Sequence, residues 1–274
     1  MKPSSLLLFL LCITHLVNAQ SVSTLIGAKQ AGMGYASSAL SDEWVVFNNI
    51  GGLGNVENQS AAFAYEVTPL LEGGNRIAAV FNSPLNWGTV GFGAFRFGDE
   101  IYSEHVLSAG VGNRFGITSL GAKVNYIQYR ATGFGTHSAF SFDFGGITQL
   151  TPELSIGAYI TNLTQSSLST SDGNRLPTKL TVGLGIRPSE KVFITTEIEK
   201  DLDYKPTWRT GLEYAILKSL FFRTGYNFNP QSTFFGLGTK KKNLKIDYAI
   251  RFNQQLGAIH QASASYRISS KEKR

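Results

Sequence analysis

The sequence is poor in cysteine, in proline and in long apolar runs. Its 274 residues include eight prolines and one cysteine, Cys12, which lies in an apolar run near the N-terminus. The rest of the chain therefore has no thiol for a disulfide framework. Beyond that first run, no stretch approaches the roughly 18 consecutive apolar residues that indicate a membrane-spanning helix. Disulfide-stabilised folds and helical membrane bundles are both excluded.

Clustered positive charge is also scarce. The formal net charge is +6, and basic residues gather only at Lys240–Lys242 and at Lys271–Arg274. Nucleic-acid binding needs a basic face, so we expect no nucleic-acid partner.

Motifs for catalysis and metal binding are missing as well. Beyond residue 19 the histidines are His105, His137 and His260, and none lies in an HExxH or Cys/His pattern. A lipid hydrolase built on His105 or His260 would need an orienting partner that the sequence does not show. The repeated Gly-x-Gly pairs lack a following helix and indicate strand glycines instead of phosphate loops. We expect no catalytic residue, no metal and no cofactor.

The N-terminus has the pattern of an export signal. Lys2 supplies positive charge, Leu6–Val17 is apolar, and small residues precede a cleavage site before Gln20. The alternative is a membrane anchor, but a run of about 12 residues is short of the roughly 20 needed to span a bilayer. We therefore expect residues 1–19 to be a signal peptide.

Short amphipathic strands fill the chain from residue 59. Phe140, Phe142 and Phe144 share one face of such a strand, while the intervening residues are polar or small. The same alternation predicts fourteen strands, at residues 59–68, 75–83, 89–98, 104–115, 118–131, 138–150, 154–164, 176–188, 191–200, 206–217, 220–229, 232–241, 244–253 and 259–268.

Two features favour a membrane barrel over a soluble β-sandwich, which also alternates. The polar face is rich in glycine and serine, as suits a narrow lumen. Aromatic residues recur near strand ends, as in the girdles of outer-membrane barrels, at Tyr65, Phe81, Phe115, Tyr126, Trp208, Phe228, Phe252 and Tyr266. We predict an all-β, transmembrane antiparallel β-barrel of about 14 strands at residues 59–268, in the outer membrane, contacting its lipid. Both mature termini, including a tail at 269–274, are expected in the periplasm.

Charges of both signs fall on the predicted inward face. Pairing between neighbouring strands, for example among Glu197, Glu199, Arg209 and Glu213, would offset the cost of burying them. The set is either a salt-bridged filling or the lining of a polar conduit, and it comprises Asp143, Lys179, Arg187, Glu197, Glu199, Arg209, Glu213, Arg223, Asp247 and Arg251. Inward aromatics either fill the lumen or line an apolar pocket: Phe95, Phe97, Tyr159, Phe193 and Phe221.

Residues 20–58 do not alternate like a strand. We expect this segment to form an N-terminal hatch inside or beneath the barrel, either a moving gate or, as the paired charges favour, a fixed plug. Its turns are expected at Gly32, Gly34, Asp42, Asn48, Asn49, Gly51 and Gly52.

The motifs of this segment resemble the PorV/PorQ family of FadL-like outer-membrane barrels. They are Gly-Ala-Lys-Gln-Ala-Gly-Met-Gly at 27–34, Ala-Leu-Ser-Asp at 39–42 and Phe-Asn-Asn-Ile-Gly-Gly-Leu at 47–53. Ile50 and Gly51 stand where the family usually has proline and alanine. Leu176–Leu180 and the closing strands are similar too.

That resemblance implies a fourteen-stranded barrel that works with the type IX protein secretion machinery, assisting export or surface attachment. Other type IX components and secreted cargo proteins would then be its partners. Two alternatives stay open. One is a FadL-like channel for hydrophobic small molecules, and the other is a structural barrel that docks a partner membrane protein.

Overall fold

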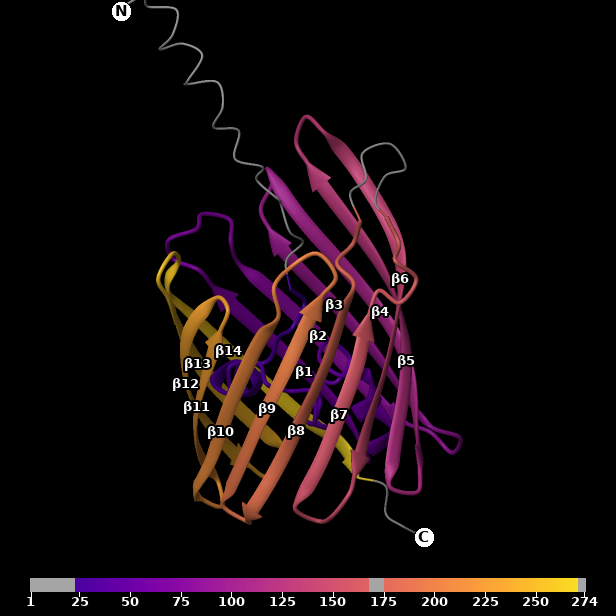
Figure 1. The fold of residues 1–274 in the computed structure, drawn as a ribbon, viewed down its shortest axis with the longest axis vertical. Coiled ribbons are helices and arrows are strands. Elements are labelled where there is room, and N and C mark those ends of the chain that lie inside the picture. The colour runs from indigo at the N-terminus through magenta and orange to yellow at the C-terminus, as the bar shows by residue number, and fades with distance from the viewer. Residues whose placement is uncertain (1–22, 168–174, 271–274) are drawn as a thin grey trace, which may run out of the picture.

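Fourteen antiparallel strands close into a barrel in the computed structural model, which describes residues 23–167 and 175–270 (Figure 1). Each strand pairs with the next along the chain, and β1 pairs with β14 to close the wall. The strands are β1 (Asn58–Val67), β2 (Arg76–Pro84), β3 (Thr89–Gly98), β4 (Tyr102–Phe115), β5 (Thr118–Ala131), β6 (Gly135–Gln149), β7 (Leu154–Thr161), β8 (Lys179–Ser189), β9 (Val192–Asp201), β10 (Thr207–Leu217), β11 (Leu220–Phe228), β12 (Gln231–Lys241), β13 (Leu244–Asn253) and β14 (Gly257–Ser270).

The predicted fold class is confirmed, and the alternation explains the wall. Phe140, Phe142 and Phe144 point outward and are 62%, 51% and 46% exposed, whereas Ser141 and Asp143 are buried inside. Apolar side chains thus cover the outside and polar ones line the lumen, the reverse of a soluble protein. This arrangement supports an outer-membrane location.

Several strands differ from the predicted boundaries by up to three residues, and the pair β7 and β8 is shortened where they face each other. β7 ends at Thr161 and β8 begins at Lys179, so the wall strands are shorter here than 154–164 and 176–188. Asn162 ends β7 because it adopts a left-handed backbone, with φ of 52°. Its side chain then donates to the Leu176 carbonyl at 2.8 Å, which joins the two sides of the connection.

The two ends of the barrel differ. The connections β1–β2, β3–β4, β5–β6 and the corresponding later ones lie at the upper end in Figure 1, which we call the loop end. The other connections, together with Asn58 and Ser270, lie at the opposite end, which we call the turn end. The β5–β6 hairpin reaches highest at the loop end (Figure 1).

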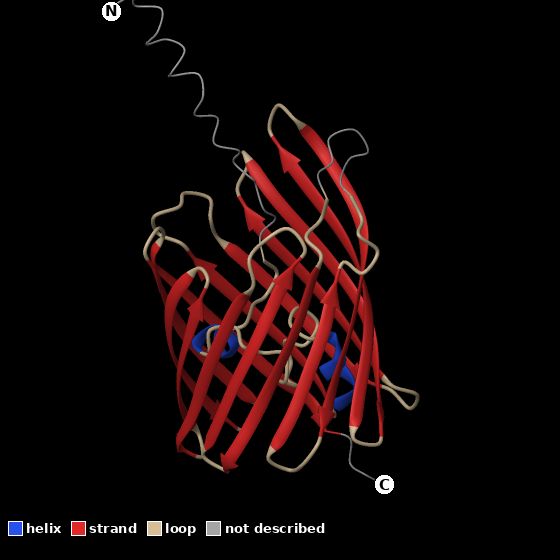
Figure 2. Cartoon of the chain, viewed as in Figure 1, coloured by secondary structure: helices blue, strands red, loops and turns tan. Residues whose placement is uncertain are grey.

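Residues 23–57 occupy the interior of the barrel, and we call them the lumen segment. It contains a short helix, α2 (Ala28–Gly32), and a 3-10 helix, η1 (Ile50–Asn55), which Figure 2 shows in blue inside the red wall. α2 contacts β11 to β14, and η1 contacts β3 to β7. In the part of the chain that the structure describes, neither helix is long and apolar enough to cross a membrane.

The first and last described residues lie at opposite ends of the barrel, while the mature termini, both expected in the periplasm, fall outside the described residues. The Ser23 carbonyl accepts a hydrogen bond from Arg76, the first residue of β2, at the loop end. Ser270 pairs with Asn58 at the turn end. The lumen segment therefore runs down through the barrel before β1 begins. The expected signal peptide and the final tail residues 271–274 lie outside the described residues.

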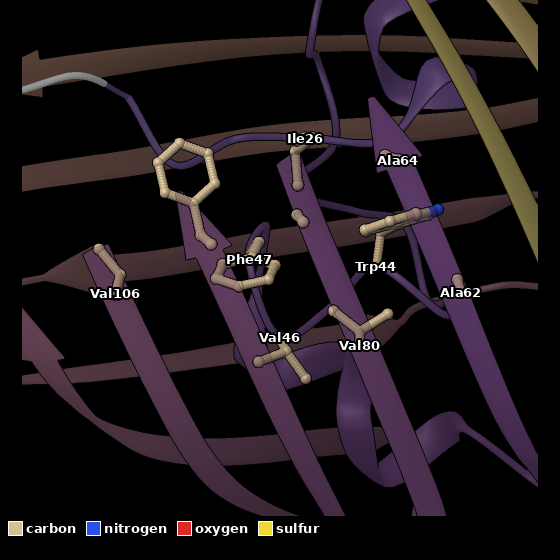
Figure 3. Close-up of a cluster of buried hydrophobic side chains, with 10 residues drawn as sticks. Ile26, Trp44, Val46, Phe47, Ala62, Ala64, Val80 and Val106 are labelled. Atoms are coloured by element: carbon tan, nitrogen blue, oxygen red, sulfur yellow. The ribbon is translucent and has the colours of Figure 1, made fainter. Parts of the chain in front are cut away.

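An apolar cluster joins the lumen segment to β1–β4 (Figure 3). Trp44, Val46 and Phe47 are at most 2% exposed and share this cluster with the small residues Ala62 and Ala64 of β1, and Val46 and Phe47 lie against Gly93 of β3. Small wall residues leave room for large ones from the segment, so the two surfaces interlock. Burying each large side chain contributes about 1.5–3 kcal/mol, and this cluster anchors the segment to β1–β4.

Candidate functional site

The lumen segment lies close against the barrel wall at glycines. A Cβ atom on Gly51 would overlap the backbone of Gly146 in β6, and one on Gly32 would come within 3.1 Å of the Gly236 Cα in β12. Gly34 has a φ of +67°, which also favours glycine there. Gly32, Gly34 and Gly51 thus face wall backbone, and this close contact explains why these residues are small.

The two neighbouring asparagines satisfy backbone groups within the segment. The Asn48 side chain donates to the carbonyls of Ile26 and Trp44 at 3.2 and 3.1 Å. The Asn49 side chain donates to the Ser38 carbonyl at 2.6 Å and accepts from the Gly51 amide at 2.9 Å. These bonds hold the turn that leads into η1. The neighbouring Gly52 is buried as well.

Glu197 of β9 holds the middle of the segment. Its carboxylate accepts hydrogen bonds from the Ser37 and Ser38 amides at 2.9 and 2.8 Å. The same carboxylate pairs with Arg209 at 2.8 Å, and Glu197 is 1% exposed. We call this arrangement the Glu197 clasp. It fixes segment backbone to a charged wall residue that is itself neutralised.

A second polar contact forms where the segment enters the barrel. Glu66 pairs with Arg76 at 2.9 Å and accepts from the Tyr35 hydroxyl at 3.0 Å. Burial raises the pKa of the Tyr35 hydroxyl well above its ordinary value, and the Glu66 charge adds to the shift. Tyr35 therefore stays protonated and donates. Arg76 also donates to the carbonyls of Ser23 and Leu25.

Near the turn end, two acidic residues of the segment form ion pairs, one with a lysine of the wall and one with a lysine of the segment. Glu43 pairs with Lys245 at 3.1 Å and accepts from the Ser265 hydroxyl at 2.6 Å. Burial raises the pKa of the Glu43 carboxyl, but Lys245 and Ser265 lower it more, so the pKa lies below its ordinary value. Asp42 pairs with Lys29 at 3.4 Å inside the segment.

Most members of the predicted lumen charge set form ion pairs between strands, all of them neighbours except for Arg223 of β11 and Asp247 of β13. Arg209 bridges Glu197 and Glu199, at 2.8 and 3.0 Å, and the two acids lie on adjacent inward positions of β9. The other pairs are Lys123–Asp143, Lys179–Glu199, Lys179–Asp201, Arg223–Glu213 and Arg223–Asp247, at 3.1, 3.6, 3.9, 2.6 and 2.7 Å.

Three members of the set differ from the expected pairing. Glu213 pairs with Arg223, which lies directly opposite it on β11, and so is separate from the Arg209 group. Arg187 follows an irregularity in β8, is exposed at the turn end and stacks on Phe193 at 4.3 Å. Arg251 faces the lumen, but no carboxylate among the described residues lies within ion-pair distance of it, and its Nε atom is buried without a partner.

The sequence pattern missed several cations and acids that hold the segment. Lys29 and Glu43 belong to the segment itself, where no alternation assigns a face. Arg76 is absent from the predicted set, although it occupies the inward position opposite Glu66. Its position across from Glu66 on the neighbouring strand was the signal that could have identified Arg76 as a lumen cation.

Two cavities lie above the lumen segment at the loop end. The larger, about 450 Å³, we call the vestibule; its lining includes Leu25, Tyr35, Tyr204 and Arg251. The smaller, about 100 Å³, we call the recess, and it has an apolar side formed by Phe47, Val106, Ile127, Leu176 and Pro177. Both are lined by Ser23, Leu25, Lys179 and Glu199, so they adjoin.

Two further cavities, each of about 260 Å³, lie at the turn end and adjoin at Lys29, Ser41 and Asn55. Of the described residues that line these four cavities, none lines both a loop-end cavity and a turn-end cavity. The lumen segment lies between them and separates the vestibule from the turn end.

The inward aromatics are divided between filling and lining. Phe95 packs in the apolar cluster, and Tyr159 lines the recess. Phe193 lines a turn-end cavity, while Phe97 and Phe221 are half-buried. On the outer wall, the His260 Nδ1 lies 2.6 Å from the Tyr248 hydroxyl, and His105 faces outward from β4 beside Arg96. In the part of the chain described here, no group of His, Cys, Asp or Glu is arranged to hold a metal.

These features define a class: an outer-membrane-type β-barrel whose lumen is occupied by its own N-terminal segment. No protein-family model and no curated protein matches the sequence. Solved structures share the fold. CymD, a monoaromatic hydrocarbon channel, has a TM-score of 0.67 and 12% identity, over 91% of this chain and 99% of its own.

Two toluene transporters are similar in the same way. TodX of Pseudomonas putida has a TM-score of 0.66 and 12% identity, over 92% of this chain and 99% of its own. TbuX of Ralstonia pickettii has a TM-score of 0.65 and 14% identity, over 90% and 99%. All three are channels or transporters, not enzymes. At this identity they establish the fold, so the likeness to FadL-like barrels holds for architecture, and PorV/PorQ itself is not among these matches.

Proposed function

We propose that this protein is a FadL-like outer-membrane channel for a small molecule that enters the vestibule from outside the cell. One observation carries the proposal: the vestibule opens among the loops and adjoins a recess with an apolar side directly above the lumen segment. Ligand sites are typically concave and partly apolar, with a few polar groups that orient the ligand. The hydrocarbon and toluene specificities of CymD, TodX and TbuX support the same class of function.

The proposal includes an orientation. The loop end faces outside, and the turn end faces the periplasm, where residues 269–274 lie. Residues 1–19 direct export and are removed. The domain arrangement that follows is an N-terminal hatch segment at 20–58, which contains the lumen segment, and a membrane barrel at 59–268.

Passage then requires the lumen segment to move, because it separates the vestibule from the turn-end cavities. Its polar contacts with the wall hold it in place between passages: the Glu197 clasp, the Arg76 bonds and the Glu43–Lys245 pair. In this scheme the segment is a gate with strong closed-state contacts.

The proposal is tested by uptake of a small neutral aromatic, with toluene as the probe. Cells from which the gene is deleted are compared with the same cells carrying the gene. We expect faster accumulation of labelled toluene when the gene is present. Equal rates over a range of low concentrations would refute channel function for neutral aromatics.

A role in type IX secretion is the second candidate, with other secretion components and secreted cargo proteins as partners. The observation that favours it is the closely filled lumen, in which segment backbone lies directly on wall backbone at Gly51 and Gly146. A barrel permanently closed in this way would act as a scaffold. Affinity purification from outer membranes tests this role. Recovery of secretion components supports it, and recovery of the barrel alone contradicts it.

A further inference from the structure

The vestibule is positively charged, unlike a cavity built for a hydrocarbon. Five of its lining residues are cationic and two are carboxylates, with the cations at Arg76, Lys179, Lys205, Arg209 and Arg251. Glu66 and Glu197 neutralise Arg76 and Arg209 from behind. Counting these two acids with the lining pair, Glu199 and Asp201, still leaves one positive charge in excess.

The deeper cations are matched, with one exception. Arg76 is held by Glu66, and Arg209 by Glu197 and Glu199. Lys179 lies between Glu199 and Asp201. Lys205 is exposed at the rim, where water solvates it. Below the rim the four cations and the four carboxylates therefore balance, and the excess charge is that of Lys205. Arg251 is the one of these four cations for which no carboxylate among the described residues lies within ion-pair distance.

Arg251 has a well-defined place on the inner wall. It lies opposite Phe234 of β12 and Ile259 of β14, both of which are at most 2% exposed. One step nearer the loop end, Asn227 and Ser232 face each other on the same inward face. The side chain is thus backed by apolar residues and bordered by polar ones.

The carboxylate of Glu66 is already occupied by other donors. Glu66 influences Arg251 electrostatically, but its oxygens accept from Arg76, Tyr35 and Gln261. A half-buried guanidinium without a carboxylate or hydrogen-bond partner is costly. Its planar, five-donor fork matches a carboxylate bidentately.

We propose that Arg251 binds the carboxylate of a small organic acid in the vestibule. This inference rests on the proposed channel function and gives its substrate class. The acid's apolar body lies against Leu25, Tyr35 and Tyr204, and the cavity of about 450 Å³ accommodates a single-ring acid. The substrate class thus differs from that of the neutral-hydrocarbon channels that share the fold.

The test is calorimetric titration of the detergent-solubilised protein with benzoate, and with benzyl alcohol as the neutral analogue. The variant is Arg251→Gln, which keeps a hydrogen-bonding side chain. The control is Arg267→Gln, which removes an arginine that lines a turn-end cavity. We expect Arg251→Gln to weaken benzoate binding at least tenfold and to leave benzyl alcohol binding unchanged. Arg267→Gln leaves both unchanged, and Arg251→Lys restores part of the benzoate affinity. Heat-modifiable gel migration checks that every variant is folded.

Equal affinity of the wild-type protein for benzoate and benzyl alcohol would overturn the inference, while channel function for neutral molecules would stand. Equal benzoate affinity in the wild type and Arg251→Gln would also overturn it, because benzoate would then bind elsewhere. Failure of both compounds to bind, together with unchanged toluene uptake after deletion, would contradict the proposed channel itself.

Discussion

The Glu197 clasp is the contact whose loss should release the lumen segment most selectively. Glu197→Ala removes the acceptor of the Ser37 and Ser38 amides, which are bonded to it at 2.9 and 2.8 Å. Two buried N–H groups then lose their partner, at about 1–3 kcal/mol each. Taking about 3 kcal/mol for the pair, and about 1.4 kcal/mol per factor of ten, the open population of the segment rises roughly a hundredfold. The barrel ladder itself does not involve this side chain.

The assay is single-channel conductance in planar bilayers, combined with hydrogen exchange of residues 23–57. The matched control is Glu199→Ala, which removes a buried carboxylate from the same strand and from the same Arg209, but makes no hydrogen bond to the segment. We expect frequent openings and faster exchange of the segment in Glu197→Ala only. Identical behaviour of the two variants would refute the clasp.

Three further outcomes follow from the same contacts. Gly51→Ala should lower the free energy of unfolding by about 1–3 kcal/mol through overpacking, and with it the unfolding temperature, because the new Cβ overlaps the backbone of Gly146. Gly146→Ala should lower it less, because its Cβ meets the flexible Leu120 side chain. The pKa of Glu43 is depressed below 4.5. The stabilisation that the ionised Glu43 gives to the closed segment is therefore complete above pH 4.5 and is lost as the pH falls through the lower, folded-state pKa. Channel opening should therefore rise only in that acidic range, and Glu43→Gln should remove this pH dependence. Lys123→Met, which leaves the Val46 carbonyl without the bond of 2.6 Å, should speed exchange of the segment without changing the heat-modifiable shift.

The wall could be predicted from the sequence because period-two alternation is local. The lipid-facing Phe140, Phe142 and Phe144 and their polar neighbours determine strand and face together. The prediction failed at residues 162–164 and 176–178, which lie outside β7 and β8, and a left-handed backbone at Asn162 ends β7 early. No alternation rule detects that conformation.

The lumen segment was harder to predict because its contacts join residues far apart in the sequence. Its glycines indicated tight turns, but their wall partners, such as Gly146 for Gly51, depend on barrel closure. The sequence predicted that the inward charges form ion pairs, but it assigned some of the partners wrongly. Glu213 lies opposite Arg223 because of the strand register. No carboxylate among the described residues pairs with Arg251, since Glu66 is occupied by other donors.

The central claim is that a small molecule passes only when the lumen segment moves. A disulfide between Val46→Cys and Gly91→Cys would lock it, because a Cβ on Gly91 lies 2.7 Å from a Val46 side-chain methyl and otherwise meets only side-chain atoms. Beyond residue 19 the natural chain has no competing cysteine. Uptake of labelled toluene by cells carrying this double variant should stop when the disulfide forms and return on reduction. Unchanged uptake by the locked protein would contradict the claim.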